Sequence, residues 1–191
     1  MDIEIFLDNQ TKFLWEVFKI GLPAQDTIKI PKTHPDFRWG VVMPQSLTIE
    51  QIICSYSDIC PVWRWTNDNI DLITKSVRSA DKGTYTTWFR DGVEPEEKYK
   101  NKSANHIQSD GINGSTLIER LLLGRWFTWM TDGQYLDVVN ITRCDATRDF
   151  RGYVPAVYFD TRDGQLYIFR HDPEETDDSL RTREAISWEE K

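Results

Sequence analysis

The most regular pattern of apolar positions lies in residues 116–130, where apolar side chains occupy more than one face of a predicted helix. Thr116 followed by Glu119 has the spacing of a capping box, and Gly133 suits the end of the helix. Gly124 inside it costs about 1 kcal/mol of helix propensity. We expect this helix to be central and covered on more than one side, because its apolar positions form more than one stripe: Leu117, Ile118, Leu121, Leu122, Trp126, Trp129 and Met130.

Two further helices are expected before the central one. Thr48 and Gln51 form a second capping box, and the apolar positions that follow predict a helix to about Asp58. Another helix is predicted to begin near Thr66 or Asp68, because both are good N-caps, and to end before Gly83. Its expected buried side chains are Ile70, Ile73 and Val77.

The first 46 residues give mixed signals. Polar and apolar residues alternate from Ile3 to Leu7, which predicts a short half-buried strand. Residues 13–18 have helical spacing before Gly21 and Pro23, although a strand is the alternative for FLWEVFKI. Four prolines in residues 22–46 indicate connecting chain, with a short strand at residues 27–30.

Strand patterns dominate the rest of the chain. TYTTWFR, residues 84–90, is rich in aromatic and β-branched residues and precedes an Asp-Gly turn. Three more strands are expected at residues 136–143, 153–159 and 165–170, and Asp163-Gly164 predicts a hairpin between the last two. No βαβ rhythm is present, so we expect an α+β fold in which the central helix packs against an antiparallel sheet.

A chain of 191 residues suits one compact domain spanning residues 1–191. Within it we expect an N-terminal extension of residues 1–38 and a surface connection at residues 93–115, which has few apolar side chains. Residues 172–191 form an acidic C-terminal end, and they lack the regular spacing of a calcium loop.

Composition excludes several classes of function. A net charge of −8 argues against general nucleic-acid binding, and no apolar run is long enough to cross a membrane. The N-terminus is acidic where a secretory signal is basic, and the three cysteines lack CxxC spacing, so we expect a cytoplasmic protein without disulfides. Phosphate-loop, dinucleotide, serine-hydrolase and zinc-protease motifs are missing, so we expect neither cofactor nor metal.

The richest polar cluster lies between two predicted strands, in residues 140–155. One interpretation is a binding site, because guanidinium groups held by aspartates bind phosphates and carboxylates. The other is a surface loop whose charges neutralise one another. We expect a non-catalytic binding protein for a small anion or an acidic protein partner, with Arg148 and Arg151 as its main positive groups. The whole predicted site comprises Arg143, Asp145, Arg148, Asp149 and Arg151.

Cys144 supports a different hypothesis, a small cysteine-dependent hydrolase or transferase. Neighbouring arginines favour a thiolate, and His171 is the one histidine followed by a carboxylate residue. No signature of a known cysteine enzyme surrounds Cys144, so a buried thiol is the simpler interpretation.

A second candidate binding segment is CPVWRW, residues 60–65, in a chain with eight tryptophans. In extended chain, Trp63 and Trp65 share one face, where they either stack on a ligand or pack between helices. Arg64 then points the other way, toward solvent or an acidic partner. Trp88, Trp126 and Trp129 are expected in the core.

Several stretches together resemble a family of uncharacterised proteins predicted from bacterial genomes. The resemblance covers about residues 39–188 and rests on VWRWTNDNIDLI, GTYTTWFRDGVEPEEKYKNKSAN, STLIERLLL, YLDVVNITRCDATRDFRGYVPAVYFD and SLRTREAIS. It implies a bacterial, cytosolic protein, and it brings no activity, substrate or site residue with it.

Overall fold

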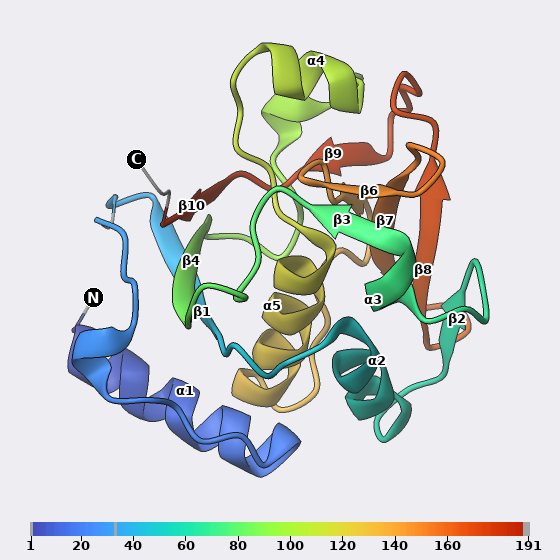
Figure 1. Ribbon diagram of the computed structural model, residues 1–191. Helices are drawn as coiled ribbons and strands as arrows, with labels where there is room; N and C mark the ends of the chain where they lie inside the picture. The colour runs from blue at the N-terminus through green and yellow to red at the C-terminus, as the bar shows by residue number, and fades with distance from the viewer. Residues whose placement is uncertain (1, 33, 189–191) are drawn as a thin grey trace.

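The central helix α5 (Leu117–Met130) runs between two β-sheets in the computed structural model, which describes residues 2–32 and 34–188 (Figure 1). Its predicted capping box is present, since Thr116 accepts from the Glu119 N–H and Glu119 accepts from the Thr116 N–H. Both sheets contribute buried side chains to the same core as α5. The predicted single α+β domain is therefore confirmed.

The packing around α5 explains why residue 124 is a glycine. A Cβ atom at this position would lie 2.5 Å from both an Arg120 nitrogen and the Tyr56 hydroxyl oxygen. Tyr56 belongs to α2 (Ile49–Ser57), and its hydroxyl donates to the Leu121 carbonyl at 3.0 Å. The cost in helix propensity thus permits close contact between two helices. The capping box predicted for α2, with Thr48 and Gln51, is also present.

A three-stranded antiparallel sheet covers one side of α5. It contains β1 (Phe37–Met43), β4 (Tyr85–Arg90) and β10 (Ala185–Ser187), with β4 in the middle. The strand at β4 is confirmed, whereas β1 lies where connecting chain was expected. The prolines misled that interpretation, because Pro35 and Pro44 flank the strand and none lies inside it.

Helix α1 (Ile3–Phe18) packs beside β1, so the strand expected at Ile3–Leu7 is wrong. Its buried side chains recur at helical spacing, and Phe13 and Leu14 are fully buried in the common core. The Gln10 side chain donates to the Gly40 carbonyl and accepts from the Val42 N–H, which satisfies part of the free edge of β1. The N-terminal segment is therefore built into the fold.

Residues Gln25–Thr27 form the short 3₁₀-helix η1, and Lys29 makes an isolated parallel bridge to Tyr85.

A five-stranded sheet covers the other side of α5, in the order β2-β8-β7-β5-β9. The predicted hairpin joins β7 (Val154–Asp160) to β8 (Gln165–His171), and Gly164 in its turn has φ 68°. The edge strands β2 (Val62–Arg64) and β9 (Leu180–Thr182) each pair in parallel with a neighbour. Of the strand predicted at residues 136–143, only β5 (Ile141–Arg143) forms. Asp137 adopts φ 56°, and the N–H groups of residues 138–140 donate to the Glu94 carboxylate instead of a neighbouring strand.

The second predicted helix is much shorter than expected. Only α3 (Ile70–Ile73) is helical, capped by Asn69, and the chain then enters β3 (Thr74–Ser76). β3 pairs antiparallel with β6 (Thr147–Asp149), which lies far away in sequence. Val77, predicted to be buried, is 74% exposed. Tertiary pairing therefore overrides the helical periodicity here.

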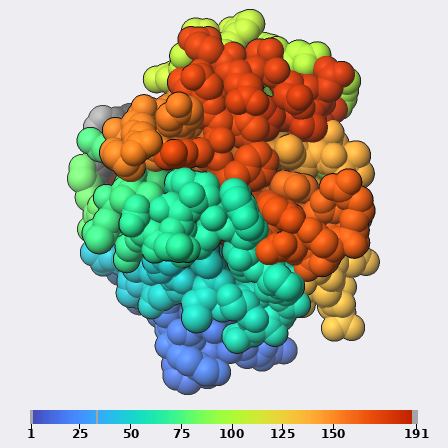
Figure 2. All heavy atoms as spheres, turned by 90° about the vertical axis from the view of Figure 1, so that its right-hand side faces the viewer, coloured from blue at the N-terminus to red at the C-terminus, as the bar shows by residue number. Residues whose placement is uncertain are grey.

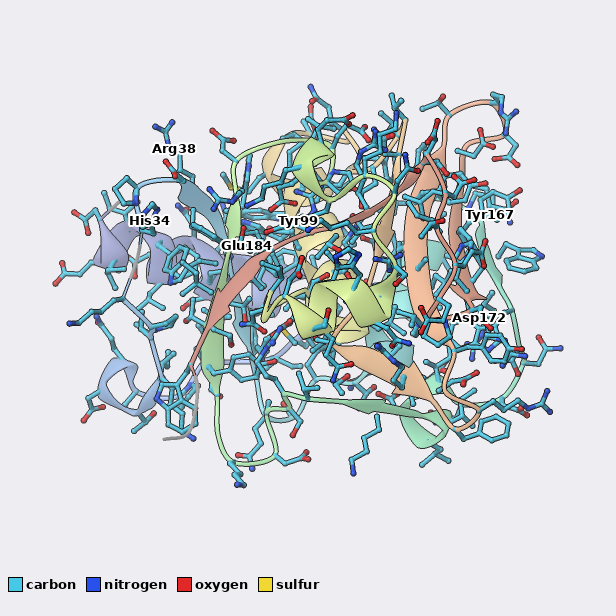
Figure 3. All side chains as sticks on the ribbon, turned by 90° about the horizontal axis from the view of Figure 1, so that it is seen from above. His34, Arg38, Tyr99, Tyr167, Asp172 and Glu184 are labelled. Carbon is cyan, nitrogen blue, oxygen red and sulfur yellow. The ribbon has the colours of Figure 1, made fainter. Side chains whose placement is uncertain are left out.

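The connection at residues 93–115 is more ordered than expected. It contains the 3₁₀-helix η2 (Glu97–Tyr99) and helix α4 (Ala104–Ser109). Tyr99 and Ile107 are buried, and the Tyr99 hydroxyl donates to Glu184 at 2.8 Å (Figure 3). This segment is thereby fixed to the C-terminal part of the chain, of which residues 189–191 lie outside the described ranges.

Candidate functional site

The polar cluster predicted as a binding site divides into an interior part and a surface part. Arg143 is fully buried and donates to Asp145 at 2.6 Å, and Asp145 also accepts from the Thr182 hydroxyl at 2.6 Å. Burial raises the pKa of the Asp145 carboxyl, although Arg143 and Thr182 oppose that shift. Arg143 and Asp145 therefore form an internal ion pair, and the Thr182 hydrogen bond connects it to β9.

Asp149 and Arg151 shape the turn that follows β6. Asp149 is buried, accepts from the N–H groups of Arg151 and Tyr153, and forms an ion pair with Arg170. Arg151 is exposed, and its guanidinium lies 5.1 Å from the centre of the Phe150 ring. These contacts account for both residues within the turn itself.

Arg148 has a different environment. It lies directly opposite Lys75 in the β3–β6 pair, so two cationic side chains are cross-strand neighbours. Its guanidinium donates to the carbonyls of Asp145 and Thr147, at 2.6 and 3.0 Å. Within residues 2–32 and 34–188, no carboxylate lies within ion-pair distance of Lys75 or Arg148. Burial lowers the pKa of the Arg148 guanidinium; the Asp145 charge opposes this shift and Arg143 adds to it.

Lys75 and Arg148 line a surface hollow of about 330 Å³, which we call the arginine hollow. Residues 111–114, which precede α5, and Asp145 also line it. Gly114 packs closely there, because a Cβ would lie 3.0 Å from the Asp145 side chain. In Figure 2 the segment around β3 lies against the orange residues near 150, as their pairing requires.

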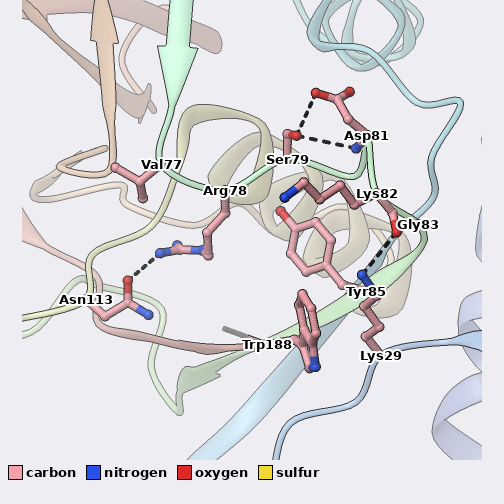
Figure 4. Close-up of a pocket in the computed structure, with 10 residues that line it drawn as sticks. All are labelled: Lys29, Val77, Arg78, Ser79, Asp81, Lys82, Gly83, Tyr85, Asn113 and Trp188. Atoms are coloured by element: carbon pink, nitrogen blue, oxygen red, sulfur yellow. Dashed lines mark hydrogen bonds between the residues drawn. The ribbon is translucent and has the colours of Figure 1, made fainter. Parts of the chain in front are cut away.

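A second hollow of about 500 Å³, the tryptophan hollow, adjoins the first (Figure 4). Val77 and Asn113 line both hollows. The other lining residues come from three parts of the chain that are distant in sequence: Lys29, then Arg78, Ser79, Asp81, Lys82, Gly83 and Tyr85, and finally Trp188.

The inner wall of the tryptophan hollow is held by Glu119, which is fully buried at the start of α5. Arg78 donates to both of its oxygens, at 3.0 and 2.6 Å, and the hydroxyls of Tyr85 and Thr87 donate to it as well. Burial alone raises the pKa of Glu119, but the Arg78 charge and the donated hydrogen bonds together lower it below its usual value. Arg78 thus serves to fix this wall.

The strand β2, at one edge of the five-stranded sheet, contains Trp63 and Arg64, and Trp65 follows it directly. Arg64 forms two hydrogen bonds to Glu50, at 2.7 and 2.8 Å, so an acidic partner is indeed present. Trp63 is 45% exposed and packs on Tyr167, which Figure 3 shows at the outer side of the molecule. Trp65 packs against the core. Trp63 therefore extends an aromatic row on the sheet, and no hollow described above includes it.

Cys144 and His171 lie on opposite faces of that sheet. Cys144 is a fully buried member of the core, and burial raises the pKa of its thiol. His171 contacts the ring of Phe169 on the outer face and lies 2.9 Å from Glu175. A buried thiol with a raised pKa is a poor nucleophile. This arrangement gives no support to cysteine-dependent catalysis.

Sequence reasoning identified Arg148 but missed Lys75, Trp188 and the loop at residues 111–114. Lys75 was placed inside a helix, and no local pattern indicates that it faces Arg148.

None of the helices in the described ranges is long and apolar enough to span a membrane. Among the same residues, no cluster of three or more His, Cys, Asp or Glu side chains is arranged to hold a metal ion.

Comparisons with family models, with curated proteins and with solved structures find no match for this chain. The resemblance to uncharacterised bacterial proteins accordingly stays an expectation.

Proposed function

We propose that this protein is a non-catalytic binding protein for a small anion, which it holds between Lys75 and Arg148. The observation that carries the proposal is the direct opposition of these two cations across β3 and β6, with no carboxylate paired to either among the described residues. Like charges directly opposite each other destabilise a strand pair. A bound anion removes that repulsion.

The surroundings support this proposal. The chain has a net charge of −8, so a small anion is attracted to this protein only where positive groups gather locally. Arg148 is held in place by its hydrogen bonds to two carbonyls, which reduces the entropy lost when a ligand binds. A rigid strand pair also positions both cations more precisely than a loop would.

The chemistry of the two side chains defines the ligand class. A guanidinium presents several N–H donors in one plane to phosphate or carboxylate oxygens, and an ammonium adds a point charge. The arginine hollow, at about 330 Å³, lies at the lower end of the size range of small-molecule sites. Phosphate and small phosphate esters are therefore the ligands to test first.

The test is a titration of the protein with inorganic phosphate at low ionic strength, followed by calorimetry. Arg148→Gln should weaken binding by about tenfold or more, the effect of losing a charged hydrogen bond, and Lys75→Gln should weaken it as well. The matched control is Arg151→Gln, which removes one positive charge from the turn after β6 without changing the hollow.

The comparison of these variants separates a site from a general charge effect. Binding that is unchanged in Arg148→Gln would exclude the arginine hollow. An equal loss of affinity in Arg151→Gln would mean that phosphate responds only to net charge. Melting temperatures of all three variants verify that each is folded before affinities are compared.

A further inference from the structure

The arginine hollow and the tryptophan hollow form neighbouring parts of one surface. Val77 and Asn113 line both, and the 74% exposed Val77 side chain separates them. Lys75 and Val77 are two residues apart, which in extended chain corresponds to about 7 Å. A ligand held by Lys75 and Arg148 therefore reaches the tryptophan hollow by passing over Val77.

Trp188 provides an aromatic surface in the second hollow. The Lys29 ammonium group lies 3.9 Å from the centre of one of its rings and also donates to the Lys82 carbonyl at 3.0 Å. In Figure 4 the indole lies beside Lys29, and both residues line the hollow. Lys29 thus holds the indole in position while adding a positive charge beside it.

The remaining polar groups of this wall are fixed by bonds within the protein. The Asn113 side chain accepts from Arg78 and donates to the Ala185 carbonyl at 3.1 Å. The Ser79 hydroxyl donates to Asp81 at 2.8 Å. With these groups engaged, the indole and the apolar Val77 side chain are the main surfaces for contact with a flat ring.

We infer that the anion bound between Lys75 and Arg148 carries an aromatic ring, which stacks on Trp188 across Val77. The inference rests on the proposed function and adds the ligand class, a nucleoside phosphate or another aromatic phosphate. The two hollows, of about 330 and 500 Å³, have room for the charged and the aromatic parts of such a molecule.

The experiment compares four probes by calorimetry: inorganic phosphate, ribose 5-phosphate, AMP and adenosine. AMP should bind more tightly than ribose 5-phosphate by roughly 5- to 150-fold, the range expected for stacking one base on an aromatic side chain. Trp188→Leu should remove this advantage and leave phosphate binding unchanged. Trp15→Leu is the control, since Trp15 is 58% exposed on α1 and lines neither hollow.

The outcomes distinguish the aromatic site from the anion site. If phosphate binds but AMP binds no more tightly than ribose 5-phosphate, the aromatic site is overturned and the anion site stands. If none of the four probes binds, both proposals fail. Should Trp188→Leu not fold, magnetisation transfer from the adenine protons of AMP to the Trp188 indole in the wild-type protein decides the matter, and its absence contradicts the inference.

Discussion

Arg183 donates a hydrogen bond of 2.6 Å to Asp137, and both side chains are buried in the interior. The other Asp137 oxygen accepts from Arg120 of α5, also at 2.6 Å. One carboxylate therefore connects the central helix to the C-terminal part of the chain. Two buried arginines depend on it for charge compensation.

Replacing Asp137 with Asn should lower the free energy of unfolding by about 3–5 kcal/mol, because the two arginines then lose their buried counter-charge. Asn also tolerates the positive φ of this position, so the effect reports mainly on the charge. Urea denaturation measures it. Asp163→Asn, at an exposed turn, is the control, and a loss below about 1 kcal/mol at Asp137 would contradict the interpretation.

The central position of α5 predicts a large effect for a truncated leucine. Leu121→Ala should lower the free energy of unfolding by about 2–5 kcal/mol, since Leu121 is fully buried and a cavity remains. Leu72→Ala, at a leucine that is 83% exposed, should change it by less than about 0.5 kcal/mol. Similar values for both variants in thermal denaturation would remove α5 from the core.

Glu119 predicts a dependence of stability on pH. Its pKa in the folded protein lies below the ordinary value of 4.5, so its contribution is present above pH 4.5 and is lost as the pH falls through the folded pKa. Glu119→Gln should therefore be less stable than wild type at pH 7, and the difference should shrink in acid. Denaturation curves between pH 7 and pH 3 test this, and a constant difference would refute it.

The three cysteines should differ in their reaction with a thiol-alkylating reagent. Cys54 is exposed, whereas Cys60 and Cys144 are buried and burial raises the pKa of both thiols. Brief treatment at neutral pH should modify Cys54 first, as mass spectrometry of the peptides would show, and denaturant should make all three reactive. Rapid modification of Cys144 in the folded protein would instead revive the cysteine-dependent hypothesis.

The sequence by itself determined the elements whose signals are local. The capping boxes at Thr48 and Thr116 define where α2 and α5 begin, because each box joins residues only three positions apart. The turn at Asp163-Gly164 predicts the β7–β8 hairpin for the same reason. Together with the missing βαβ rhythm, these signals were sufficient for the α+β class.

Only the tertiary structure decided which elements meet and where a ligand has room. Residues 74–76 lie within a segment of helical periodicity, yet they form β3 because their backbone groups find partners in β6. That pairing alone brings Lys75 opposite Arg148, and the folding of three distant segments brings Lys29, Tyr85 and Trp188 to one hollow. Contacts between residues so far apart depend on packing of the whole chain, and no local pattern in the sequence encodes them.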